Sequence, residues 1–299
     1  MNIWENIKLT FKRGDALIKL IYVNVGVFVA LKIIEILFRL FNASVDFIMP
    51  WLAVPADLTM LLHRFWTPVT YMFLHEGFFH IFFNMLCLYW FGKIFLSAFS
   101  ERHLIGLYFV GGLAAALFYV AAYNIFPYYA PLVSSNILLG ASGSIMAVIV
   151  ASATKLPNME IRLFLFGGVK LKYVAIVAIL VSFFGITSSN GGGELAHLGG
   201  ALTGYLFIVL LNKGTDITAW FNKIADALVN FFMPQKMNIK KGKKGTSSQQ
   251  TKKMGDEEYN ISKARNMAEI DRILDKIKES GYDSLSSEEK KRLFDQGKK

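Results

Sequence analysis

Six long apolar runs, separated by shorter polar segments, dominate the first 212 residues of the chain. Each approaches the length of about 20 residues that crosses the hydrocarbon core of a bilayer as a helix. The predicted spans are Leu17 to Leu40, Phe73 to Phe95, Leu104 to Phe126, Ile137 to Ala153, Leu171 to Ile186 and Leu195 to Leu211. The pattern predicts an all-α, multi-pass membrane protein with six transmembrane helices.

Composition and charge agree with this class. Hydrophobic residues make up 54% of the 299 residues, far more than a soluble domain of this size needs. Lys and Arg gather in alternate loops, from Lys93 to Arg102 and from Lys155 to Lys172, and in the tail from Lys213 onward. Because cytoplasmic loops collect positive charge, both termini are expected in the cytoplasm. The expected location is the bacterial inner membrane. These loops and the tail account for most of the formal charge of +10, so we expect no nucleic-acid partner.

The composition changes after the last span. The predicted parts are a cytoplasmic segment (1–16), the membrane domain (17–212), an interfacial amphipathic helix (213–235), a basic flexible linker (236–260) and a small cytoplasmic helical unit (261–299). The alternative for 213–235 is a seventh span. The stretch from Lys236 to Lys253 has seven lysines and no acid, which favours contact with anionic lipids. In the small helical unit, Gly281 predicts a helix end, and Ser286 to Glu289 predict a capping box at the start of a second helix. The partner that this unit binds is unknown.

Two polar residues inside apolar runs indicate chemistry. Ser142 lies in Gly140-Ala141-Ser142-Gly143, and His197 follows Ala196 in the last run. Such residues are costly to insert into a membrane and usually serve function, and Ser with His can form a nucleophile and its base. We expect Ser142 about five residues below the start of its helix and His197 two or three below its own, both in the outer third of the bilayer. A lone membrane Ser can also merely bond the carbonyl one turn earlier.

The second span begins with a histidine-rich stretch. At about 100° per residue, His80 and Asn84 share a helix face, whereas His75 is rotated roughly 140° from His80 and should point elsewhere. A zinc site would need histidines four residues apart, and these are five apart, so we expect no metal. An aspartyl protease is disfavoured because no Asp falls inside a predicted span.

Small residues on two helices indicate close packing. Gly143 and Ala147 are four residues apart, as are Gly200 and Gly204, the spacing that lets helix backbones approach closely. A proton can pass between Ser and His only over about 3 Å, so such packing fits the catalytic interpretation. Generic helix packing is the alternative.

Taken together, these motifs resemble those of the rhomboid family of intramembrane serine proteases. The resemblance covers roughly Leu17 to Asn212. It rests on Phe73-Leu74-His75 with His80 and Asn84, on Gly140-Ala141-Ser142-Gly143, and on Ala196-His197 with Gly200 and Gly204.

The resemblance implies a six-helix bundle that cleaves transmembrane segments of other proteins without a cofactor. Ser142 would be the nucleophile and His197 the base, and the backbone N–H of Ser142 with His80 and Asn84 would form the oxyanion hole. His75, Gly140 and Met146 would lie beside these groups. We see no third acid at the right depth, so a Ser-His dyad is expected.

Two departures and two rival functions remain. Many rhomboids have Tyr where this chain has Met146, and Arg where it has Thr67. A catalytically inactive rhomboid-like protein would bind transmembrane segments for trafficking or degradation, but it would usually lack Ser142 or His197. A transporter is a third possibility, supported only by the charged pair Lys32 and Glu35 in the first span.

Overall fold

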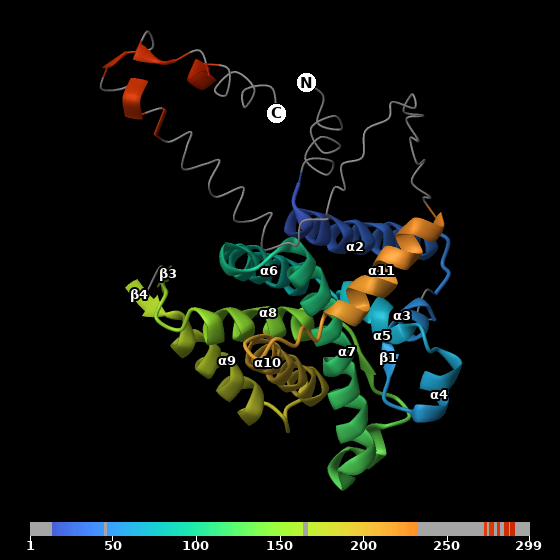
Figure 1. The fold of residues 1–299 in the computed structure, drawn as a ribbon. Helices are drawn as coiled ribbons and strands as arrows, with labels where there is room; N and C mark the ends of the chain where they lie inside the picture. Colours follow the sequence, from blue (N-terminus) through green and yellow to red (C-terminus); the bar gives the residue numbers. More distant parts are fainter. Residues whose placement is uncertain are drawn as a thin grey trace, which may run out of the picture. The chain divides into compact units, whose positions relative to one another are not determined.

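A computed structural model describes residues 14–44, 47–163 and 167–232, together with residues 272–273, 275–277, 280–281, 284–286 and 288–290. The chain divides into two compact units, Met1–Gln235 and Lys236–Lys299 (Figure 1). The predicted basic stretch from Lys236 to Lys253 lies outside the described residues.

The first unit is a helical bundle. Its long helices are α2 (Ala16–Leu40), α6 (Phe78–Ala98), α7 (Glu101–Ile125), α8 (Ser142–Lys155), α9 (Leu171–Phe184), α10 (Gly191–Leu211) and α11 (Ala219–Phe232). Shorter helices are α3 (Ile48–Leu52), α4 (Leu58–His63), α5 (Thr67–Thr70), η1 (Tyr71–Phe73) and η2 (Pro127–Leu132). Strand β1 (Val54–Pro55) pairs with β2 (Ile137–Leu138), and β3 (Glu160–Leu163) pairs with β4 (Gly167–Lys170), both antiparallel.

Four helices in the described part of the chain are long and apolar enough to cross a membrane: α2, α6, α7 and α10. The apolar helices α8 and α9 have 14 residues each, about 21 Å at 1.5 Å per residue. Helix α8 contacts α6, α7, α9 and α10 (Figure 1). Every residue from Gly143 to Ala153 is buried. A helix enclosed by protein needs no lipid-length span, because its ends meet protein groups instead of hydrocarbon.

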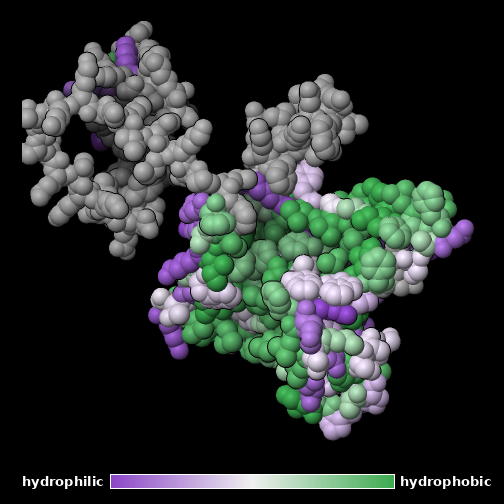
Figure 2. Space-filling model, turned by 90° about the vertical axis from the view of Figure 1, so that its right-hand side faces the viewer, coloured by the Kyte–Doolittle hydropathy of each residue, from purple (hydrophilic) through white to green (hydrophobic). Residues whose placement is uncertain are grey.

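The outside of the bundle is apolar. Large exposed side chains include Phe79 on α6, Leu117 on α7 and Phe184 on α9, at 72%, 66% and 77% exposure. Hydrophobic residues also cover much of the visible described surface in Figure 2. Surface of this extent and kind suits contact with lipid chains.

Three predicted helix starts are wrong. Helix α8 begins at Ser142 instead of Ile137, because Ile137 and Leu138 pair with β1 and Gly140 then adopts φ +116°. A short apolar run does not distinguish strand from helix by periodicity. Helix α6 begins at Phe78, after the 3-10 turn Tyr71–Phe73, and α10 begins at Gly191, four residues before the predicted Leu195.

Buried tyrosines anchor the segment before α6 to α7. Tyr71 donates its hydroxyl to the carbonyl oxygen of Gly112 at 2.6 Å, and Tyr108 donates to that of Met72 at 3.0 Å. The N–H of Gly140 in turn donates to the carbonyl oxygen of Tyr71 at 3.0 Å. These bonds fix the turn that precedes α8.

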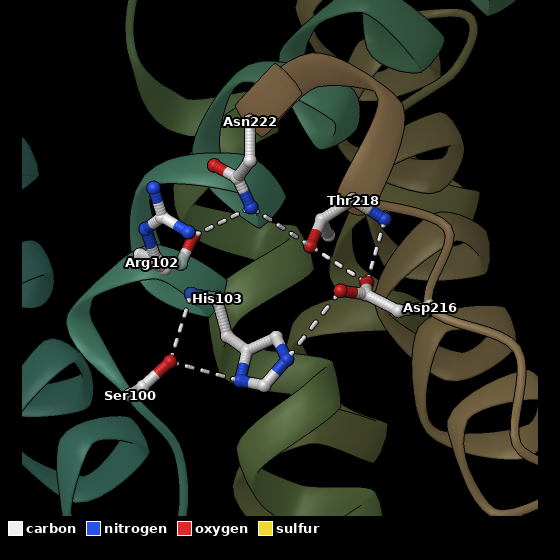
Figure 3. Close-up of polar contacts among 6 residues, drawn as sticks. All are labelled: Ser100, Arg102, His103, Asp216, Thr218 and Asn222. Atoms are coloured by element: carbon white, nitrogen blue, oxygen red, sulfur yellow. Dashed lines mark hydrogen bonds and ion pairs between the residues drawn. The ribbon is translucent and has the colours of Figure 1, made fainter. Parts of the chain in front are cut away.

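Polar contacts join the start of α11 and the segment before it to the first turn of α7 (Figure 3). His103 lies between Ser100, 3.1 Å from Nδ1, and Asp216, 3.5 Å from Nε2. Asn222 donates to the carbonyl oxygen of Arg102 at 3.3 Å. The helix leaves an apolar row exposed, namely Trp220, Ile224, Leu228 and Phe231. This row suits the predicted interfacial helix, and its lipid contact stays a prediction.

In the second unit the described residues include the predicted capping box. The backbone N–H of Ser286 donates to Glu289 Oε2 at 2.7 Å, and that of Glu289 donates to Ser286 Oγ at 3.3 Å. The first of these bonds, together with the ammonium of Lys276, lowers the pKa of Glu289 to about 2. Gly281 has φ +78°, as a helix-ending glycine requires.

Candidate active site

Ser142 is the first residue of α8. Gly140 ends the preceding turn with φ +116°, a conformation that L side chains rarely adopt, so the turn requires glycine here. The N-cap residue, Ala141, makes no side-chain capping hydrogen bond, and the first N–H groups of a helix have no partner within it. The expected depth, about five residues into the helix, is therefore wrong. The hydroxyl instead lies at the positive end of the helix dipole, where N–H groups can bind an oxyanion.

His80 approaches the same turn from α6. A Cβ atom built on Gly140 would lie 3.0 Å from His80 Nε2 and 3.8 Å from Ser142 Oγ. The imidazole and the hydroxyl therefore flank the space that the missing side chain leaves. The structure thus brings His80 and Ser142 together at one point.

Among the described residues, four buried side-chain atoms lack a hydrogen-bond partner: both ring nitrogens of His75, Asn84 Nδ2 and Ser144 Oγ. Asn84 lies one turn after His80 on α6 and is 8% exposed. A buried amide without a partner is costly, so a site that keeps one is a candidate for binding an oxygen atom.

The expectation that His75 points away from His80 is wrong. His75 precedes α6, so the helical rotation used to place it does not apply. Its ring contacts that of His80 edge to face, with ring centroids 5.0 Å apart. His75 therefore packs behind His80 and restricts its orientation.

His197 lies in the second turn of α10. Its Nδ1 atom is 3.1 Å from Ser182 Oγ on α9 and 3.2 Å from Glu194 Oε2 on its own helix. The expectation of no acid near the base is therefore wrong. The helix was predicted to start at Leu195, which left Glu194 in a loop. In the structure it starts at Gly191, so Glu194 lies three residues before His197 on the same helix face.

Glycines bring α8 and α10 into backbone contact. A Cβ atom on Gly200 would lie 2.0 Å from the carbonyl oxygen of Gly143, and one on Gly204 would lie 2.2 Å from that of Ala147. A Cβ on Gly143 would lie 3.4 Å from the carbonyl oxygen of Ala196. The residues next to Ser142 and His197 are thus in contact. Met146, one turn after Ser142, is buried within the bundle.

A polar cavity of about 480 Å³ adjoins His80. Its lining includes Glu76, Asn136, Ser189 and Asn190, from the segments before α6, α8 and α10. A cavity needs polar partners and room to hold water, and this one has both. Within the described residues, no group of three or more His, Cys, Asp or Glu side chains could hold a metal ion.

The fold and this site define a helical membrane protein with a serine and a histidine on two helices in backbone contact. The model of the Rhomboid domain matches residues 62–214, and the chain belongs to the rhomboid family. Residues 255–299 match a family of unknown function (DUF6576).

Two relatives support the assignment. RHOMBOID-like protein 12, mitochondrial, from Arabidopsis thaliana is 28% identical over 220 residues, which are 71% of this chain and 62% of that protein. Rhomboid protein 1, mitochondrial, from Saccharomyces cerevisiae is 30% identical over 148 residues, 48% of this chain and 41% of that protein. The chain thus spans less than two thirds of either relative. Both are mitochondrial, so they do not support the expected bacterial inner membrane.

The close approach of α8 and α10 can be tested with a single methyl group. Gly200→Ala should lower the free energy of unfolding by about 1–3 kcal/mol, because the new Cβ meets backbone that cannot yield freely. Gly26→Ala on α2 is the control, since its Cβ would have nothing within 4 Å. There the better helix propensity of Ala should leave stability unchanged or raise it by up to about 1 kcal/mol. Thermal unfolding in detergent micelles measures both, and equal effects would contradict the packing.

Proposed function

We propose that the protein is an intramembrane serine endopeptidase that cleaves transmembrane segments of other membrane proteins. The observation that carries this proposal is the glycine-mediated contact between α8 and α10, which sets the start of α8, with Ser142, beside the helix that bears His197. Membership of the rhomboid family supports it.

The chemistry begins at Ser142. Its Oγ attacks the scissile carbonyl carbon while His197 takes the hydroxyl proton through Nε2, the ring nitrogen not engaged by Ser182 and Glu194. When the tetrahedral intermediate collapses, His197 gives this proton to the leaving amine and an acyl-enzyme remains. A water molecule, activated by His197 in the same way, then releases the second product. The polar cavity beside His80 is a suitable source of this water.

The oxyanion is stabilised by three donors in this proposal: the backbone N–H of Ser142 and the side chains of His80 and Asn84. The first lies at a helix N-terminus, where the dipole favours negative charge. Asn84 Nδ2 has no partner among the described residues and is therefore free to donate. Preorganised donors of this kind are worth on the order of 3 kcal/mol each.

The substrate is a membrane-embedded helix in this proposal, because the bundle that carries the site is apolar outside and belongs in lipid. A helix hides its carbonyl carbons within its own hydrogen bonds, so the substrate must unwind locally to reach Ser142. The family resemblance further suggests a small residue before the scissile bond.

We further propose six spans, with α8 and α9 joining the four longer helices, and both termini on the side of the basic loops. The hairpin between α8 and α9 carries Arg162, Lys170 and nearby Lys172, which favours the cytoplasmic side. The lysines from 236 to 253 would hold anionic lipids on that side.

Removing the nucleophile or the base tests the proposal. Ser142→Ala and His197→Ala should each lower cleavage of a single-span substrate in liposomes by at least about 10³-fold. Ser152→Ala is the matched control, because Ser152 is a buried serine of the same helix whose hydroxyl only bonds the carbonyl of Val148. It should cleave like the wild type.

Two outcomes of that assay would contradict the proposal. Cleavage that survives in Ser142→Ala would overturn the mechanism. A wild type that binds the substrate without cleaving it would favour the inactive, segment-binding alternative.

The oxyanion role of Asn84 predicts opposite effects on activity and stability. Asn84→Ala should lower kcat by about 10²-fold or more, because one donor to the oxyanion is lost. Thermal stability should stay unchanged or rise, since the variant removes a buried donor that has no partner. A fall in stability with unchanged kcat would instead assign Asn84 a structural role.

A further inference from the structure

Glu194 and His197 form a half-buried pair at the start of α10. The carboxylate oxygen Oε2 lies 3.2 Å from His197 Nδ1, and the two side chains are 16% and 20% exposed. Contacts in such surroundings are screened less by water than those of surface pairs. The pair is therefore able to influence how the imidazole is oriented and charged.

The end of α9 is shaped around this carboxylate. Gly185 ends the helix, and a Cβ atom there would lie 2.9 Å from Glu194 Cγ and 3.1 Å from Cδ. Ser182, one turn earlier and 2% exposed, presents its hydroxyl 3.1 Å from the same His197 Nδ1. The missing side chain of Gly185 thus leaves the space that the Glu194 side chain occupies.

We propose that Glu194 is a positioning residue for His197, so that the site works as a Ser-His-Glu arrangement instead of a dyad. This inference rests on the proposed peptidase function. The carboxylate accepts a hydrogen bond from Nδ1–H, which keeps Nε2 free of a proton and available to Ser142.

The proton balance of the step is simple. The proton of Ser142 Oγ moves to His197 Nε2 and later to the leaving amine, while Glu194 remains a carboxylate throughout. Its negative charge stabilises the imidazolium that exists between the two transfers. The other titratable groups close enough to act on this step are His80 on α6, which interacts electrostatically with His197, and Glu76, which interacts with His80.

A purely structural role is the competing explanation, because an acidic side chain near a helix N-terminus stabilises the helix dipole. Such a role would change stability without changing how the rate depends on pH. Glu101 offers a matched control, because its carboxylate accepts a hydrogen bond from the backbone N–H of Ala16, the first residue of α2, at 2.9 Å.

The test measures kcat and KM of the full chain in liposomes for the wild type, Glu194→Gln and Glu101→Gln. Each is measured from pH 5.5 to 9, with about half a pH unit between points. Glu194→Gln should lower kcat by about 10²–10⁴-fold, in line with the loss of such an acid in serine proteases, with KM changed far less. Its pH profile should also differ from that of the wild type, because the carboxylate beside the imidazole is gone. Glu101→Gln should leave the profile unchanged.

A second variant distinguishes displacement of the carboxylate from misfolding of Glu194→Gln. Gly185→Ala leaves all the reacting groups intact but displaces the Glu194 side chain, and it should lower kcat in the same direction. Unchanged kcat and pH profile in both Glu194→Gln and Gly185→Ala, while Ser142→Ala and His197→Ala are inactive, would overturn this inference alone. A wild type without cleavage would overturn the proposed function instead.

Discussion

The contact between the backbones of α8 and α10 is the constraint on which the site depends. At Gly200 and Gly204 a Cβ atom would lie 2.0 Å and 2.2 Å from carbonyl oxygens of α8, so no other residue fits without a shift. In a bilayer, hydrophobic burial contributes little to helix association, and close packing of small residues replaces it. The same contact places Gly143, next to Ser142, against Ala196, next to His197. Packing and proposed chemistry thus depend on the same glycines.

The enclosure of α8 by other helices would separate the proposed polar reaction from the apolar lipid. The helix contacts α6, α7, α9 and α10, and a Cβ atom on Gly140, just before its start, would lie 3.0 Å from His80 Nε2. Protein groups therefore adjoin its first turn. The polar cavity is lined by His80 of α6, and Asn84, whose side-chain donor has no partner among the described residues, lies one turn further along that helix. Unpaired polar groups cost stability, and a site that binds an oxyanion and water is a reason to retain them.

Much of the bundle could be predicted from the sequence, because apolar runs of helical length are a strong signal. The predicted first residues of three helices were wrong. Ile137 and Leu138 have the hydropathy of a span but pair with β1, a long-range contact that no periodicity contains. Glu194 was missed as an acid near His197 for a similar reason, because the start of α10 was predicted four residues too late and left Glu194 in a loop. His75 was misplaced because it was assigned to a helix that begins only at Phe78.

The proposed mechanism requires that His197 activates Ser142 as a nucleophile. Reaction with a fluorophosphonate, followed by peptide mapping in a mass spectrometer, tests this most directly because it needs no substrate. We expect a single adduct on Ser142 that is lost in His197→Ala, with Ser144 and Ser152 unmodified. An adduct on another serine, or equal labelling of Ser142 without His197, would contradict it.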